Sequence, residues 1–311
     1  MGWIVDIERQ NRALLEYRQY ILSLVDCGGP SPSQYDELEC WYCTLWNMLQ
    51  SGEITRADIR HLWATTGDVY SSKTMQGHAC QKPYGYAGDY EMIDKIYLKW
   101  VTHDPCLSKW DVFFHSQAAP QAVRNRKTYF LTRLTTLENK KAKHARVLNV
   151  ASGPSRDIYE YLSANPDSRL RFDCIDMEPK AIEFSQALLG EFSNSVTFTC
   201  QNVFRMKANG TFKAYDLVWS AGLFDYLDDR AFVVLLKKLD ALVAPGGELV
   251  IGNISLFNPT RAYMEFGEWC LNYRSEQHLI ELAELSSLGE KTVYVDSEPE
   301  QVNLFLHVVN E

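Results

Sequence analysis

Short apolar segments alternate with helical segments throughout the second half of the chain, and this alternation limits the possible folds more than any other feature. Strands are expected at residues 145–151, 170–176, 196–201, 215–222 and 246–254, with a closing pair at 292–295 and 304–309. Helices are expected over 155–162, 179–189, 229–242 and 259–274. Such alternation is typical of parallel βαβ units with right-handed crossovers. The sequence therefore predicts an α/β fold with a doubly wound, mostly parallel, seven-stranded Rossmann-like sheet.

The first half of the chain has a different character. Apolar residues recur at helical spacing over residues 4–26, 33–50, 54–61, 91–101 and 120–138, and no pair of strands is evident. Residues 66–90 are rich in glycine, serine and tyrosine, so we expect a loop there. The sequence thus predicts an N-terminal helical cap or lid domain (1–143) followed by the sheet domain (144–311).

Composition and charge exclude several classes of protein. The formal net charge of −9 argues against a general nucleic-acid-binding surface. No apolar run approaches the ~20 residues of a membrane span, and the start of the chain does not look like a signal peptide. Eight cysteines are too sparse for a disulfide scaffold. We expect a cytoplasmic protein with a small-molecule substrate and neither a nucleic acid nor a membrane as partner; a homodimer stays open.

Cys40 and Cys43 have the spacing of a redox or zinc motif. They lie inside a helical pattern, and no second pair of ligands at similar spacing follows. We therefore expect two buried helix thiols and no metal.

The first strand of the sheet domain ends in Val-Leu-Asn-Val-Ala-Ser-Gly-Pro-Ser, residues 147–155. Gly153 has no Cβ, so a ligand can approach the backbone there, and Pro154 suits the first turn of the helix that follows. Free N–H groups at that turn favour an anionic group such as a carboxylate. In doubly wound sheets the ligand lies at the carboxyl ends of the strands, where strand order reverses. A nucleoside-containing ligand is expected at this elbow.

Polar residues follow the other strands. Asp176 ends the second strand and can accept hydrogen bonds from ribose hydroxyls, although a carboxylate at a helix start is the alternative. Asn202 follows the third strand and meets an adenine edge or satisfies the loop backbone. The segment after the fourth strand lies where the reactive end of the ligand would be, and it contains Ser220, Gly222 and Tyr226.

In this order, the segments VLNVASGPS, FDCIDMEP, TCQNVF, YDLVWSAGLFDYL and APGGELVIGN resemble class I S-adenosylmethionine-dependent methyltransferases. The resemblance covers about residues 145–311 and implies S-adenosylmethionine as cofactor. Two glycines usual at the elbow are missing, and Asn149 stands where an acidic residue is more usual. The resemblance implies cofactor contacts from Asn149, Ala151, Ser152, Gly153, Asp176, Met177, Asn202, Val203, Ser220 and Gly222.

The helical half carries a narrower likeness. KPYGYAGDYEMID and AVRNRKTYF resemble segments that precede the core in a bacterial family associated with biosynthesis of extracellular-factor 3-hydroxypalmitate methyl ester. Azetidine-2-carboxylate synthases, which cyclise S-adenosylmethionine under a helical cap, are also similar. The motifs do not separate these two branches.

Sulfonium chemistry needs little acid–base machinery, because the carbon beside the sulfur is already electrophilic and geometry and desolvation dominate. Tyr84 and Tyr86, in a glycine-containing loop, are expected to act with Tyr226 as catalytic residues, because aromatic faces attract a sulfonium. Arg124 and Arg126 either clamp a carboxylate or lie solvated on a helix face; Arg126 is the expected cofactor contact.

Four functions follow from these residues. Methyl transfer to a small carboxylate or hydroxyl acceptor leads. Intramolecular cyclisation of S-adenosylmethionine to azetidine-2-carboxylate and methylthioadenosine is the alternative. A cofactor sensor without turnover stays open, and the single elbow glycine disfavours a nicotinamide dehydrogenase.

Overall fold

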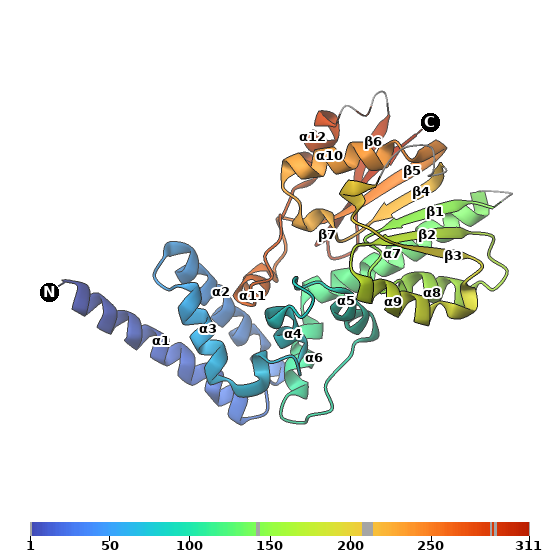
Figure 1. Cartoon of the computed structure of the whole chain (residues 1–311). Helices are drawn as coiled ribbons and strands as arrows, with labels where there is room; N and C mark the ends of the chain where they lie inside the picture. The colour runs from blue at the N-terminus through green and yellow to red at the C-terminus, as the bar shows by residue number, and fades with distance from the viewer. Residues whose placement is uncertain (1, 141–143, 207–213, 287, 289–290, 311) are drawn as a thin grey trace. The chain divides into compact units, whose positions relative to one another are not determined.

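The computed structural model describes residues 2–140, 144–206, 214–286, 288 and 291–310. The chain divides into two compact units, Met1–Pro120 with Pro259–Cys270, and Gln121–Asn258 with Leu271–Glu311. The boundary expected at residue 143 lies outside the described residues. Figure 1 shows the elements of both units along the chain.

The second unit is built on one seven-stranded sheet. Its strand order is β3-β2-β1-β4-β5-β7-β6; β1 to β5 run parallel, and β7 is antiparallel to both β5 and β6. The strands are β1 Arg146–Val150, β2 Arg171–Asp176, β3 Val196–Cys200, β4 Tyr215–Ser220, β5 Val243–Ile254, β6 Thr292–Ser297 and β7 Asn303–Val309. The predicted fold class is therefore confirmed. Strand order reverses beside β1, between β2 and β4, which makes the carboxyl ends of these strands the switch point for a ligand.

Two apolar cores cover the two faces of this sheet. One combines β1, β2 and β4 with α7 (Ala118–Lys140), α8 (Arg156–Ala164) and Leu189, which directly follows α9 (Pro179–Leu188). The other combines the strands with α10 (Asp229–Asp240) and α12 (Glu276–Leu285). Short 3-10 turns lie at η3 Gly190–Phe192, η4 Val203–Arg205 and η5 Phe224–Tyr226. The helices seen from the sequence at 155–162, 179–189 and 229–242 are present, and α12 is an additional one.

Helix α7 packs on the sheet, although the sequence division assigned it to the cap. The ring of Phe130 stacks on Trp219 with centroids 4.6 Å apart, and Tyr129 stacks on Phe305 at 4.0 Å. Arg126, Phe130 and Leu134 are four residues apart and therefore share one face of the helix. This face lies against the sheet, and α7 belongs to the second unit from Gln121 onward.

The first unit is helical. Its elements are α1 Gly2–Asp26, η1 Pro32–Gln34, α2 Tyr35–Ser51, α3 Arg56–Thr65, η2 Gly67–Tyr70, α4 Met75–Gln81, α5 Tyr90–Leu98, α6 Ser108–Ser116 and α11 Arg261–Phe266. The helix expected over 259–274 is thus only six residues long, and its residues lie in this unit. Phe266 of α11 meets the rings of Trp41 and Tyr42 at centroid distances of 5.3 and 5.0 Å. An insertion from the second half of the chain therefore completes the aromatic core of the first unit.

The prediction of a loop over residues 66–90 was wrong, because this segment contains η2 and α4. Gly77 lies inside α4, and a Cβ there would come 1.7 Å from the backbone oxygen of Ser71. Thr74 caps this helix by accepting a hydrogen bond from the Gly77 N–H at 3.0 Å. This glycine therefore permits close packing rather than a loop.

Cys40 and Cys43 lie on α2 as expected, but both are exposed, so the prediction of buried thiols was wrong. The helix buries the face formed by Leu38, Trp41, Tyr42 and Leu45, and the cysteines lie off that face. Within the described ranges, no group of three or more histidine, cysteine or acidic side chains is arranged to hold a metal ion. Over the same ranges, none of the helices combines the length and the apolar character that crossing a membrane requires.

Candidate functional site

The elbow after β1 has the backbone that glycines usually supply. Ala151, Gly153 and Ser155 have φ angles of 54°, 55° and 50°, in the left-handed region. That region costs a residue with a Cβ roughly 1–2 kcal/mol. The chain therefore keeps a glycine-type turn at the two positions where glycine is missing. Ser152 is buried, and its Oγ has no hydrogen-bond partner among the described residues.

Asp176 joins the elbow to the end of β2. Its Oδ2 accepts a hydrogen bond from the Gly153 N–H at 2.9 Å, and its Oδ1 accepts one from the Glu178 N–H at 2.9 Å. Burial raises the pKa of this carboxyl, while these backbone donors oppose the shift. A carboxylate can accept about four hydrogen bonds, and the Met177 backbone also acts on this one, so the carboxylate keeps capacity for a ribose hydroxyl. Gly153 and Asp176 therefore lie together at one edge of the sheet.

The segment after β4 meets α7 at the same edge. Ser220 is buried, and its Oγ donates to the backbone oxygen of Val150 at the end of β1, at 3.0 Å. The NH1 of Arg126 donates to the backbone oxygen of Ala221 at 2.6 Å. A Cβ on Gly222 would lie 3.5 Å from the same nitrogen. The glycine thus leaves room for the guanidinium beside the end of β4.

Arg126 is buried more deeply than its hydrogen bonds explain. The residue is 7% exposed, and its Nε has no partner among the described residues. A buried charged donor without an acceptor is unusual in a folded protein and calls for an explanation. Since a guanidinium binds carboxylates through two parallel hydrogen bonds, an anionic ligand group is the simplest one.

Two buried carboxyls lie close enough to Arg126 for its charge to act on them. Burial raises the pKa of Asp157, in the first turn of α8, to about 6, and that of Asp225, after β4, to about 7. In both cases the positive charge of Arg126 lowers the pKa by less than burial raises it. The edge therefore combines one fixed cation with two carboxyls that can change charge near neutral pH. The sequence prediction did not include these carboxyls.

The end of β3 is held by backbone contacts. The Gln201 N–H donates to the backbone oxygen of Asp176 at 2.8 Å. The Oδ1 of Asn202 accepts from the Phe204 N–H at 2.9 Å, which is the loop-backbone alternative, and leaves the amide nitrogen of Asn202 for another acceptor. Val203 is buried in the core, whereas Met177 is 65% exposed.

The remaining expected residues lie in different surroundings. Asn149 is buried within β1, between Cys174 of β2 and Trp219 of β4. Tyr226 is partly exposed at the end of η5. Tyr84 belongs to the first unit, where its hydroxyl accepts from Tyr90 at 2.9 Å and donates to Glu91 at 3.3 Å. Tyr86 of the same unit is half-buried.

These positions define what the edge of the second unit can hold. An anion can approach Arg126, a cation can approach Asp157 or Asp225, and hydroxyl groups can approach Asp176. A ligand that carries all three kinds of group matches this distribution. Asp225 could have been noticed from the sequence, because it stands in the segment after the fourth strand, but its burial could not.

No model of a known protein family matches the chain, and no curated protein matches it. Among solved structures, the chain is similar to a "possible exported protein" from Bordetella parapertussis, with 15% identity, a TM-score of 0.58, and coverage of 97% of this chain and 96% of that chain. Magnesium protoporphyrin IX methyltransferase from Synechocystis with bound S-adenosylhomocysteine is also similar, with 12% identity, a TM-score of 0.48, and coverage of 62% and 87%. N-methyltransferase NodS from Bradyrhizobium japonicum in complex with S-adenosylhomocysteine is similar with 16% identity and a TM-score of 0.43, and the match covers 71% of this chain and 97% of that chain. The Bordetella likeness extends over nearly all of both chains and concerns the fold.

Proposed function

We propose that the chain binds S-adenosylmethionine at the carboxyl edge of its sheet and transfers a carbon from the sulfonium, with methyl transfer to a small acceptor as its main reaction. The observation that carries this proposal is Arg126, which is buried, whose Nε has no partner among the described residues, and whose charge acts on the buried carboxyls of Asp157 and Asp225. An α-amino acid carries one carboxylate and one ammonium at neutral pH. The methionyl end of the cofactor therefore complements this part of the site.

The nucleoside end of the cofactor fits the elbow and the end of β2. The Asp176 carboxylate can accept about four hydrogen bonds, of which backbone N–H groups of Gly153, Met177 and Glu178 use three, and ribose offers hydroxyl donors for the remaining capacity. For the adenine we propose a place near Met177, Asn202 and Val203, because an exposed apolar side chain and an amide nitrogen flank the end of β3 there. Asn149, Ala151, Ser152, Gly153, Ser220 and Gly222 then form the floor of the site.

A dinucleotide cofactor fits less well. A pyrophosphate carries two negative charges and would have to lie beside Asp157 in the first turn of α8. Like charges at such short range are unfavourable. The same geometry tolerates a ligand with a net positive charge, as S-adenosylmethionine has.

Bound S-adenosylmethionine would supply an electrophilic carbon next to a sulfonium. The residues of this chain would then orient the cofactor, exclude water and attract its positive charge. We propose Tyr226 of the second unit for the last role, since an aromatic face near a cation contributes ~0.5–2 kcal/mol. The catalytic role expected for Tyr84 and Tyr86 stays a prediction. We also propose a reducing, cytoplasmic setting, because all eight cysteines are free thiols.

Intramolecular cyclisation is the second candidate, and one observation favours it. The methionyl amine must lose its proton before it can attack its own γ-carbon. Asp225 has a pKa raised to about 7 and lies near Arg126, where the methionyl end is proposed. A carboxylate there could take that proton.

Product analysis separates these candidates. The purified chain is incubated with S-adenosylmethionine alone and with a panel of small hydroxyl and carboxyl acceptors, and products are measured by mass spectrometry. S-adenosylhomocysteine that forms only with an acceptor supports methyl transfer. Methylthioadenosine with azetidine-2-carboxylate, formed without an acceptor, supports cyclisation and contradicts methyl transfer as the main role. Binding without any product supports a sensor and contradicts both reactions.

A further inference from the structure

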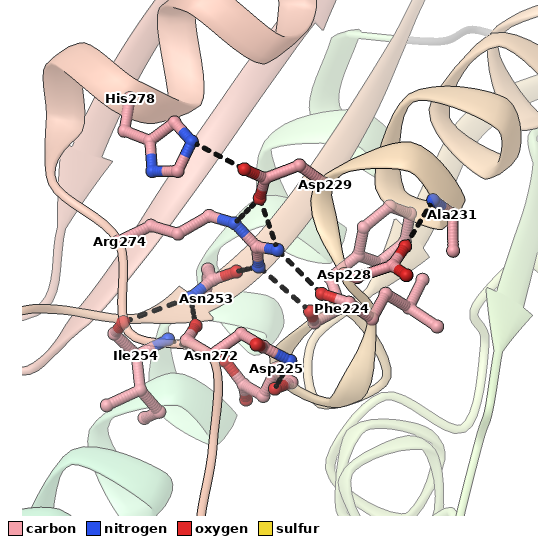
Figure 2. A network of polar contacts seen from close by, with 11 residues as sticks. Phe224, Asp225, Asp228, Asp229, Ala231, Asn253, Ile254, Asn272, Arg274 and His278 are labelled. Carbon is pink, nitrogen blue, oxygen red and sulfur yellow. Dashed lines mark hydrogen bonds and ion pairs between the residues drawn. The ribbon is translucent and has the colours of Figure 1, made fainter.

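Asp225 is fixed between the ends of β4 and β5 by hydrogen bonds to its side chain and its backbone (Figure 2). Its Oδ1 accepts from the Ile254 N–H at 2.6 Å. Its backbone oxygen accepts from the N–H of Asn272 at 2.7 Å and from the Nδ2 of Asn272 at 3.2 Å. The residue is 3% exposed. Its position is therefore set by the fold and does not depend on a flexible loop.

Arg274 holds the backbone on both sides of Asp225. Its NH1 donates to the backbone oxygen of Phe224 at 3.1 Å, and its NH2 donates to that of Leu227 at 2.6 Å. Its remaining bonds go to Asn253 and Asp229. Figure 2 shows Arg274 at the centre of this network. All N–H donors of the Arg274 guanidinium are used by these partners. Arg274 therefore holds the backbone of residues 224–227 in place and donates no hydrogen bond to the Asp225 carboxyl.

The second carboxyl oxygen of Asp225, Oδ2, has no hydrogen-bond donor in the part of the chain that the structure describes. Its neighbours in sequence have evident structural roles. Asp228 is exposed and caps α10 by accepting from the Ala231 N–H at 2.8 Å. Asp229 is exposed and bonds Arg274 and His278. Asp225 is the buried aspartate of this segment, and one of its oxygens is unused.

The charges around Asp225 keep its carboxyl able to exchange a proton near neutral pH. Burial raises its pKa to about 7, while Arg126 from α7 and Arg274 from the segment after β5 lower it by less. Arg126 also acts on Asp157, and Arg274 is bound to Asp229, so both cations are partly neutralised by other carboxyls. A carboxyl in this range can hold a proton in one step and release it in the next.

We propose that Asp225 is the proton acceptor of the reaction, receiving the proton that an ammonium group loses before it attacks the carbon beside the sulfonium, or that a hydroxyl group loses as it attacks. This inference rests on the proposed function. A bond forms between the nucleophile and that carbon, the carbon–sulfur bond breaks with its electron pair going to sulfur, and the proton passes to the Asp225 carboxylate. The protonated carboxyl then releases its proton to solvent before the next turnover.

A proton acceptor at Asp225 favours nucleophiles that carry a proton over carboxylates. A carboxylate acceptor has no proton to lose at neutral pH and would place a second anion beside Asp225. A hydroxyl or an ammonium group has a proton to lose, and the methionyl amine of the cofactor belongs to this class. The nucleophile is therefore one that carries a proton.

Calorimetry with S-adenosylmethionine as the probe tests the ionisation step. Titrations at about pH 6.5 in buffers of different ionisation enthalpy give the number of protons exchanged on binding. A free carboxyl with a pKa of about 7 is mostly protonated there, and a cationic ligand favours its ionised form, so the wild type should release roughly 0.5 proton or more per bound molecule. Asp225→Asn, whose amide oxygen can still accept from Ile254, should lose most of this release. Asp228→Asn in the same segment is the matched control and should keep it.

Two further measurements complete the test. In whichever assay yields product with the wild type, Asp225→Asn should form product about 100-fold more slowly or worse, the usual loss for a general base. If the variant does not fold or bind, infrared difference spectra of the wild type test whether a buried carboxyl loses its proton on binding. The band of a protonated carboxylic acid should disappear when S-adenosylmethionine is added at about pH 6.5.

The outcomes separate this inference from the proposed function. Unchanged proton release or an unchanged product rate in Asp225→Asn overturns the role of Asp225 while cofactor binding stands. A wild type that binds the cofactor without losing the carboxylic acid band also overturns it. No binding of S-adenosylmethionine to the wild type overturns the proposed function itself.

Discussion

Arg126 is the residue on which the proposed binding of the methionyl end depends most. It comes from α7, reaches the backbone of Ala221 and keeps its Nε without a partner among the described residues. Burial of such a donor costs about 1–3 kcal/mol or more, unless a ligand supplies the acceptor. The free protein therefore keeps a destabilised group at the place where we propose a carboxylate.

Arg126→Gln should weaken S-adenosylmethionine binding by about 10-fold to 100-fold, the loss expected for a hydrogen bond to a charged group. Titration calorimetry measures the affinity. Lys127→Gln is the matched control, since Lys127 follows on the same helix and its Nζ binds Glu160 at 2.7 Å. Equal affinities for wild type and Arg126→Gln would show that the guanidinium does not meet the ligand.

Asp225 also makes stability depend on pH. Its pKa is about 7 in the folded chain and about 3.9 when unfolded, so between these values the folded state holds a proton that the unfolded state has released. Stability from this group is present at low pH and falls as pH rises through the window. From about pH 5 to about pH 8, the wild type should lose roughly 2 kcal/mol of unfolding free energy that Asp225→Asn keeps. Denaturant unfolding at several pH values measures this difference, and parallel curves for the two proteins would contradict it.

Part of the candidate site could be predicted from individual residues in the sequence. Gly153 and Asp176 were each assigned to the ligand edge because both follow parallel strands, and in the structure a hydrogen bond joins them. Burial of Asp157 and Asp225 could not be predicted, because it depends on packing between distant segments. Asn202 could have satisfied either a ligand or the backbone, and its Oδ1 bonds the backbone. Its role toward a ligand, like that of the tyrosines, stays a prediction.

At the level of elements, helical periodicity predicted most helices but not their partners. The pattern over 120–138 gave α7 without showing that its apolar face covers the sheet. The pattern over 259–274 suggested one helix, whereas α11 ends at Phe266 and the backbone of Asn272 and Arg274 bonds Asp225 and Ile254 instead. Tertiary hydrogen bonds override local propensity there.

The close packing of α4 gives a prediction for an element. Gly77→Ala would place a methyl group 1.7 Å from the Ser71 oxygen, so α4 cannot keep its position. We expect the first unit to lose about 3 kcal/mol or more of stability, as overpacked sites against rigid backbone do. Thermal unfolding followed by tryptophan fluorescence measures this. Gly190→Ala, where a Cβ meets nothing within 4 Å, should change stability little; an equally small effect of Gly77→Ala would contradict the packing described for α4.

For the whole molecule, the main finding is that each compact unit is built from two separate stretches of chain. The segment 259–270 leaves the sheet unit and supplies α11 to the helical unit. Besides the aromatic contacts of Phe266, Glu265 accepts a hydrogen bond from the Nε1 of Trp46 at 2.8 Å. The sequence division near residue 143 missed this insertion, because only contacts between distant residues reveal it.

The insertion makes the helical unit depend on residues far along the chain. Phe266→Ala removes a ring buried to 2% exposure and should cost about 3–5 kcal/mol. The near-ultraviolet circular dichroism signal of the tryptophans should weaken, and the temperature at which the helical unit unfolds should fall. Phe257→Ala is the control, because that ring is 81% exposed and its loss should leave both signals unchanged. Identical unfolding of the two variants would show that α11 is not part of the core.

Every role proposed for these residues depends on S-adenosylmethionine binding at the carboxyl edge of the sheet. Its most direct test is calorimetric titration of the cofactor into the full chain and into Asp176→Ala. We expect one molecule bound per chain and a binding free energy weaker by about 1–3 kcal/mol in the variant, the loss expected for a buried polar pair. Absence of binding heat for the wild type at millimolar cofactor, or equal affinity in Asp176→Ala, would contradict it.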